Sequence, residues 1–281
     1  MTTYAITGAT GHLGRLVVQE LLARGVPASD VVALVRSPEK AADLGVPVRR
    51  ADYSEPATLP DALAGVDVLL LVSGTELGQR VAQHTNVVKA AEAAGVRRVA
   101  YTSIANADHS TNPLQPEHKA TEDVLRASGV PFTILRDNWY LENYTGQLPQ
   151  YLATGQVLGI DGTARVGAAT RADFAGAIAA ALLDPATEGA TVELAGPPIT
   201  LAGLAAAITE VTGTTVTYRD VTPEELTAVL RGTGMDDGTA GFVVALEESV
   251  ARGDLDVRSD DLERLLGRPA TTLADALRAS L

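Results

Sequence analysis

Cysteine is absent from the 281 residues of this chain. Its absence excludes structural disulfides, thiolate nucleophiles, iron–sulfur clusters and cysteine zinc sites. Any chemistry must therefore come from other side chains or from a cofactor. Aromatic residues make up only 4% of the sequence, but 46% of it is hydrophobic, so a chain of this length can bury a self-sufficient core without covalent staples.

Positive charge is scarce. The sequence has 22 Lys and Arg residues but 35 Asp and Glu residues, so its net charge is -13. This excess repels phosphate backbones and anionic membrane surfaces, so we predict no nucleic-acid partner. The longest run of large apolar residues, 68–72, is far shorter than the ~20 residues of a membrane-spanning helix. Because the first residues also lack the basic and apolar regions of a secretory signal, we expect a soluble, cytoplasmic protein without membrane insertion.

The first two thirds of the chain alternate short β-branched runs with longer, Ala-rich stretches of helical period. This alternation is typical of βαβ units and a parallel sheet. We predict strands at residues 3–7, 31–35, 46–50, 66–72, 98–103 and 132–135. The predicted helices cover residues 13–24, 38–44, 56–64, 79–94 and 117–128. Gly25, Gly65, Gly95 and Gly129 each follow one of these stretches, as helix C-termini favour.

After residue 135 the pattern changes. We predict a surface helix at 138–153, a hairpin around the Asp-Gly turn of 156–166, a helix at 173–183 and a last strand of the sheet at 191–194. Further helices are predicted at 201–211, 223–231, 241–252, 260–266 and 273–281, with a short strand at 215–218. The sequence thus predicts one Rossmann-type, doubly wound α/β domain over 1–281, with a small, mostly helical cap from about 138–166 and 200–281.

A glycine-rich turn, Thr7-Gly8-Ala9-Thr10-Gly11-His12-Leu13-Gly14, follows the first strand and opens the first helix. Gly8 permits a sharp turn, Gly11 lets backbone N–H groups approach a pyrophosphate, and Gly14 allows the helix to pack closely on the strand. The helix N-terminus then offers unpaired donors to an anion. The alternative is that the glycines only mark a tight turn, but the strand–turn–helix context favours a dinucleotide site.

The second predicted strand ends at Val35, and Arg36 follows where a NAD-specific site places Asp or Glu. A guanidinium binds a 2′-phosphate that a carboxylate would repel, so the position favours NADPH. Lys40 adds a second positive charge if 38–44 is helical. The alternative for both residues is ordinary solvated surface.

Several segments resemble the NmrA-like branch of the atypical short-chain dehydrogenases, and within it the bacterial NAD(P)H-dependent quinone oxidoreductases of type 2. The segments are the glycine-rich turn, Leu34-Val35-Arg36-Ser37-Pro38, Ala51-Asp52-Tyr53, the loop from Val72 to Arg80, and Arg136 to Asn143. The resemblance implies NADP(H) bound by the turn and clamped at its 2′-phosphate by Arg36. At the nicotinamide end, it implies contacts from Thr75, Glu76, Leu77 and Asn143, with Asn143 nearest the reacting ring. Ser73, which follows the end of a predicted strand, is a further candidate for cofactor binding.

The proton-transfer pair Tyr-x-x-x-Lys of typical short-chain dehydrogenases is missing, and His118 and Glu122 stand roughly in its place. This departure disfavours carbonyl or alcohol chemistry, whereas a quinone can accept hydride directly. His118 could titrate near neutral pH and protonate the product, or it could be a helix-surface histidine. No group of ligands recurs at the spacing of a metal site, so we predict no metal.

Asp137, Trp139, Tyr140 and Tyr144 form a local cluster that could line a flat quinone pocket or seal the cap against the sheet. Our prediction is the NADPH-dependent two-electron reduction of quinones by direct hydride transfer, with Asn143 and His118 as candidate catalytic residues. The alternative is a non-catalytic NADP(H) sensor that acts through a protein partner.

Overall fold

Seven parallel strands form the central sheet of the computed structural model, which describes residues 1–281. They are β1 (Tyr4–Thr7), β2 (Val31–Val35), β3 (Val48–Arg50), β4 (Val68–Leu71), β5 (Arg98–Ile104), β6 (Phe132–Asp137) and β8 (Thr191–Leu194). The spatial order is β3-β2-β1-β4-β5-β6-β8, so the direction of winding reverses between β1 and β4. Open α/β sheets bind ligands beyond the carboxyl ends of their strands at such a reversal. The predicted doubly wound fold is confirmed.

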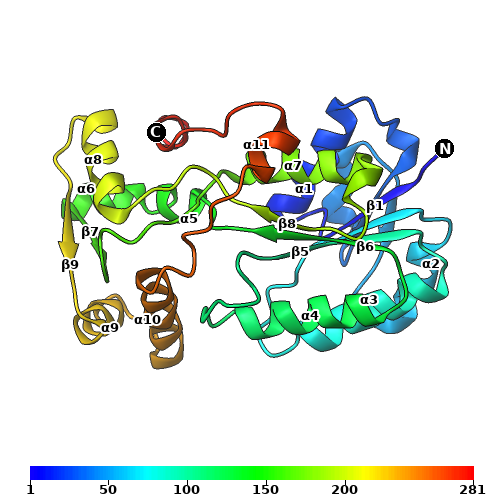
Figure 1. Ribbon diagram of the computed structural model, residues 1–281, viewed down its shortest axis with the longest axis horizontal. Coiled ribbons are helices and arrows are strands. Elements are labelled where there is room, and N and C mark those ends of the chain that lie inside the picture. The colour runs from blue at the N-terminus through cyan, green and yellow to red at the C-terminus, as the bar shows by residue number, and fades with distance from the viewer.

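The inner strands of the sheet are buried on both faces, and successive side chains enter opposite cores. Ile6 and Leu70 belong to the core under one helical layer, whereas Ala5 and Leu69 belong to the core under the other. The first layer contains α1 (His12–Ala23), α7 (Arg171–Leu183) and α11 (Asp261–Leu266). The second contains α2 (Leu59–Leu63), α3 (Arg80–Ala93) and α4 (Gln115–Ala127). Figure 1 shows these two layers above and below the sheet.

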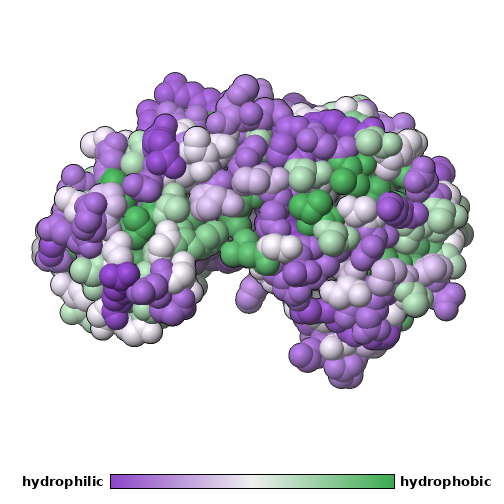
Figure 2. Space-filling view, turned by 90° about the horizontal axis from the view of Figure 1, so that it is seen from below, coloured by the Kyte–Doolittle hydropathy of each residue, from purple (hydrophilic) through white to green (hydrophobic).

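A second group of elements lies beside the sheet, at the left of Figure 1. It contains α6 (Leu148–Thr154), β7 (Gln156–Gly159), α8 (Leu201–Thr212), β9 (Thr217–Asp220), α9 (Pro223–Gly232), α10 (Asp237–Ala251) and α12 (Leu273–Arg278). Short elements complete the chain: α5 (Glu142–Thr145), η1 (Ala28–Asp30), η2 (Pro38–Leu44), η3 (Pro56–Thr58) and η4 (Pro185–Thr187). The space-filling view in Figure 2 shows two lobes divided by a notch, with hydrophobic atoms along its floor. None of the helices has the length and apolar composition that crossing a membrane requires.

Two predictions for the second lobe are wrong. The segment 156–166 is not a hairpin, because β7 pairs in parallel with the distant β9 and the chain turns away at Asp161, where φ is 80°. The segment 138–153 is not one surface helix. It contains α5 and α6, separated where Pro149 starts a new helix, and the side chains of Leu141, Tyr144, Leu148 and Tyr151 are buried.

Candidate active site

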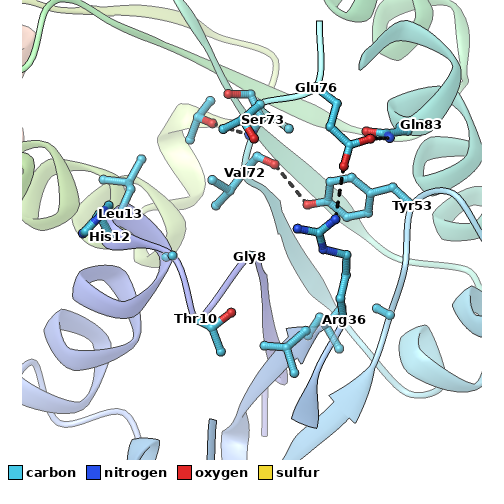
Figure 3. Close-up of a pocket in the computed structure, with 18 of the residues that line it drawn as sticks. Gly8, Thr10, His12, Leu13, Arg36, Tyr53, Val72, Ser73, Glu76 and Gln83 are labelled. Atoms are coloured by element: carbon cyan, nitrogen blue, oxygen red, sulfur yellow. Dashed lines mark hydrogen bonds and ion pairs between the residues drawn. The ribbon is translucent and has the colours of Figure 1, made fainter. Parts of the chain in front are cut away.

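A cavity of about 630 Å³ lies beyond the carboxyl ends of the central strands. The turn after β1, the ends of β2 and β3, and the loop after β4 contribute most of its lining, and Tyr140 and Arg171 reach it from the later half of the chain. Figure 3 shows side chains from these elements pointing into one space. The topology therefore brings the predicted segments to a single edge of the sheet.

The geometry of the turn after β1 requires glycine at Gly8 and Gly14. Gly8 has a φ of 58°, in the left-handed region that side chains disfavour. A Cβ on Gly14 would overlap the carbonyl oxygen of Gly8, and one on Gly11 would lie 3.1 Å from the same oxygen. The turn is thus packed tightly against the first turn of α1, which confirms the close helix–strand packing expected for Gly14.

The N-terminus of α1 opens into the cavity with unpaired donors. No side chain caps this helix, and the first backbone hydrogen bond of the helix is donated by Arg15 to Gly11. The N–H groups of His12, Leu13 and Gly14 therefore have no acceptor within the protein, and all three residues line the cavity. Unpaired N–H groups at the positive end of a helix dipole form an anion site. These residues fit the pyrophosphate of a dinucleotide.

Arg36 extends from the end of β2 along the cavity, and 69% of its side-chain surface is exposed. Its Nη1 lies 3.1 Å from Oε1 of Glu76, on the loop after β4. Lys40 lines the same end. The resemblance implies that Glu76 contacts the nicotinamide end. In the structure its carboxylate lies beside Arg36, the residue expected to bind the 2′-phosphate.

A buried polar network holds the loop after β4. The N–H of Gly74 donates to Nε2 of His84 (3.0 Å), and Nδ1 of His84 lies 3.0 Å from Oγ1 of Thr121. Arg80 donates from Nε to the carbonyl of Gly74 (2.9 Å). Burial lowers the pKa of His84 to about 3, so its ring stays neutral and Nε2 remains an acceptor. Sequence reasoning gave His84 no role, and only the fold places it against this loop.

Tyr140 and Arg171 form the opposite wall of the cavity. The guanidinium of Arg171 lies over the Tyr140 ring, 4.6 Å from its centroid, and donates to Oδ1 of Asn143 (3.3 Å). The Tyr140 hydroxyl donates to Oδ2 of Asp137 (3.4 Å). Oδ1 of Asp137 has no partner, and burial raises the pKa of this carboxyl to about 8. Asp137 is thus largely a neutral acid at pH 7.

His118 is neither a surface histidine nor a group in the cavity that could protonate a product. It is buried, with 6% of its surface exposed, and its Nδ1 lies 2.8 Å from the Tyr101 hydroxyl. Burial lowers the pKa of His118 to about 3, so it does not titrate near neutral pH. It lies outside the cavity lining. Glu122, which stands where the lysine would be, accepts from Ser103 (2.6 Å) and from two nitrogens of Arg136.

The other predicted residues divide into two groups. The lining includes Gly8, Thr10, Gly11, His12, Leu13, Gly14, Arg36, Ser73, Thr75, Glu76 and Tyr140. The remainder lie outside it. Ala9 is buried in the core, Leu77 is 52% exposed, and Tyr144 and Trp139 pack into the clusters of the second lobe. Asn143 touches the site only through Arg171.

Some lining residues were not among the predicted site residues. They include the polar residues Asp52, Tyr53, Ser54, Gln83, Thr102 and Arg171. Tyr53 donates from its hydroxyl to the carbonyl of Val72 (3.0 Å), which connects the end of β3 to that of β4. The position of Tyr53 just past a strand was the available signal, since residues that follow the carboxyl ends of β1, β2, β3 and β4 line the cavity.

A protein family described as NAD(P)H-binding matches residues 8–185 of the chain. Quinone oxidoreductase 2 of Escherichia coli is 44% identical over 277 residues, which cover 97% of this chain and 96% of that protein. An NmrA-like family domain-containing oxidoreductase of Aspergillus flavus is 35% identical, over 99% of this chain and 94% of that protein.

Solved structures show the same likeness. The NADPH-dependent quinone oxidoreductase of Escherichia coli in complex with NADPH superposes with a TM-score of 0.94, at 44% identity, over 98% of both chains. The triphenylmethane reductase of Citrobacter sp. in complex with NADP(H) superposes with a TM-score of 0.94, at 37% identity, over 99% of this chain and 100% of that one. The likeness therefore extends over both lobes.

Proposed function

The chain belongs to the NmrA-like family of NAD(P)H-binding proteins, and from that membership we propose that it is an enzyme that reduces quinones by two electrons with NADPH. When bound, NADPH supplies a hydride, which the low-lying acceptor orbital of a quinone takes up directly. The protein supplies binding, orientation and shielding from water.

The observation that carries this proposal concerns the two positions at which typical short-chain dehydrogenases have tyrosine and lysine. In this chain both positions bond to other residues of the protein. His118 is bonded to Tyr101, and Glu122 is bonded to Ser103 and Arg136, all away from the cavity. No proton-transfer pair of that kind lines the cavity. A carbonyl needs a proton delivered as hydride arrives, whereas a quinone makes a lesser demand.

We assign the binding of the cofactor to two sets of donors in the cavity lining. The N–H groups of His12, Leu13 and Gly14 would hold the pyrophosphate, and the Arg36 guanidinium would hold the 2′-phosphate. The network of His84 would keep the loop after β4 in place against the bound dinucleotide.

We assign the reacting end to Tyr140, Arg171 and Asn143. The Tyr140 ring and the Arg171 guanidinium offer a flat wall for stacking, and Asn143 orients Arg171. Asp137, neutral beneath Tyr140, adds no negative charge against the anionic product. We further propose that 1–281 is one domain, in which 138–166 and 200–281 form the substrate cap shaped by Trp139 and Tyr144.

The test is oxidation of NADPH by the purified protein with a panel of benzoquinones and naphthoquinones, compared with aldehydes and ketones of similar size. We expect turnover with quinones and none with the carbonyl compounds. Preference for the carbonyl compounds would contradict the proposal. Tight NADPH binding without turnover of any acceptor would favour the sensor instead.

A further inference from the structure

The ion pair between Arg36 and Glu76 crosses the cleft that a dinucleotide must occupy. Arg36 follows β2 and Glu76 lies on the loop after β4, and these two strands flank β1 on opposite sides. The bridge between them therefore joins the loops that follow the two neighbours of β1. Figure 3 shows the two side chains reaching toward each other, to the upper right of Gly8.

The Glu76 carboxylate is held in this position from a second side. Its Oε2 accepts a hydrogen bond from Nε2 of Gln83 (2.8 Å), and the same nitrogen donates to Oγ of Ser54 (3.1 Å). Gln83 is only 7% exposed, so it is a fixed donor on α3. With Oε1 on Arg36 and Oε2 on Gln83, both oxygens of Glu76 have a partner inside the cleft.

Charges of both signs line this end of the cavity. The cations are Arg36 and Lys40, and the carboxylates are Asp52 and Glu76. Arg36 has one ion-pair partner, Glu76, and Lys40 has none. Asp52 accepts a hydrogen bond from the N–H of Ser54 (2.9 Å) and lies at the end of β3. Glu76 is thus the carboxylate that occupies the guanidinium expected to bind phosphate.

We infer that Glu76 sets the choice between NADPH and NADH, because its carboxylate competes with the 2′-phosphate for Arg36. This inference rests on the proposed placement of the cofactor. A 2′-phosphate must displace Glu76 from Nη1 of Arg36 or share the guanidinium with it, and in both cases it lies near a negative charge, which weakens NADPH binding. The 2′-hydroxyl of NADH carries no charge and can donate to a carboxylate, so Glu76 does not oppose it. The site therefore discriminates less strongly between the two cofactors than Arg36 alone would.

The test is calorimetric titration of the full-length protein with NADPH and with NADH, comparing the parent, E76Q and E39Q. Gln at position 76 keeps the shape and can keep an acceptor toward Gln83 but removes the charge. Glu39 is exposed, lies three residues from Arg36 on η2 and does not line the cavity, so E39Q removes the same charge as a control.

We expect E76Q to lower the Kd for NADPH by a factor of about three to ten. The substitution removes an exposed ion pair that competes for Arg36 and a negative charge that repels the 2′-phosphate, and both effects favour binding. The Kd for NADH should stay the same or rise, and E39Q should change neither value by more than about twofold. An unchanged or raised Kd for NADPH in E76Q would overturn the inference, as would an equal fall for both cofactors. The titration contains no quinone, so a protein that binds NADPH but reduces no quinone would refute the proposed function alone.

Discussion

Replacing Asp137 by Asn should change how the stability of the protein depends on pH. Asp137 is 4% exposed, one of its oxygens has no partner, and burial raises the pKa of its carboxyl from 3.8 to about 8. Between those two values the folded protein holds a proton that the unfolded chain releases, so stability falls as pH rises through this range. At ~1.4 kcal/mol per pH unit, the free energy of unfolding falls by roughly 6 kcal/mol between the two pKa values.

Because Asn carries no charge in the folded or the unfolded protein, D137N should not lose stability in this way as the pH rises. The measurement is urea unfolding by far-UV circular dichroism at pH 5, 6, 7, 8 and 9. We expect the free energy of unfolding of D137N minus that of the parent to rise by about 1.4 kcal/mol per unit from pH 5 to 7 and to level off above pH 8. D61N is the control, because the side chain of Asp61 is exposed to water in the folded and the unfolded protein. If the difference in free energy of unfolding between D137N and the parent is independent of pH, the buried carboxyl is ionised throughout this range. That result would contradict a raised pKa for Asp137.

G11V should abolish NADPH binding in calorimetry without loss of the fold, whereas G14A should lower the thermal midpoint, because its Cβ would overlap a backbone carbonyl. R36A should raise the Kd for NADPH by about tenfold or more and that for NADH by less; equal losses would contradict the phosphate role. N143A should lower kcat/KM with a quinone by about 10- to 100-fold, roughly 1.4 to 2.7 kcal/mol. H118A should instead cost about 2 kcal/mol of stability in urea unfolding, with little change in kcat/KM; the opposite pattern would make His118 a proton donor.

The local features of this fold were readable from the sequence because their causes are local. The turn at Gly8 needs a positive φ, and the packing of Gly14 needs a missing Cβ, so both constraints are visible in the order of the residues. The buried strands β2 and β4 are short apolar runs, each with a helix after it. The position of Arg36 at a strand end also follows directly from this alternation.

The features that sequence reasoning missed depend on distant partners. β7 pairs with β9 across α7, β8 and α8, and no local pattern identifies that pairing. Polar residues occupy the buried face of α4, where His118, Thr121, Glu122 and Leu125 recur at helical spacing. Glu122 is tolerated there because Arg136 of β6 and Ser103 of β5 bond to it.

The placement of Glu76 shows the same limit within the site. The resemblance implies that the loop after β4 contacts the cofactor, but the direction of each side chain depends on neighbours outside the loop. Gln83 on α3 and Arg36 after β2 together hold the Glu76 carboxylate. Only the packed structure combines these contacts.

The central claim is that this protein transfers hydride from NADPH to a quinone without a side-chain proton donor in the slow step. The most direct measurement is stopped-flow absorbance at 340 nm in a single turnover, with NADPH or its 4-deuterated form and a quinone, in water and in deuterated solvent. We predict rapid loss of absorbance, with a large primary isotope effect from the cofactor and a small effect of the solvent. A dominant solvent effect would contradict the absence of a rate-limiting proton transfer, and no quinone-dependent loss of absorbance would contradict the claim as a whole.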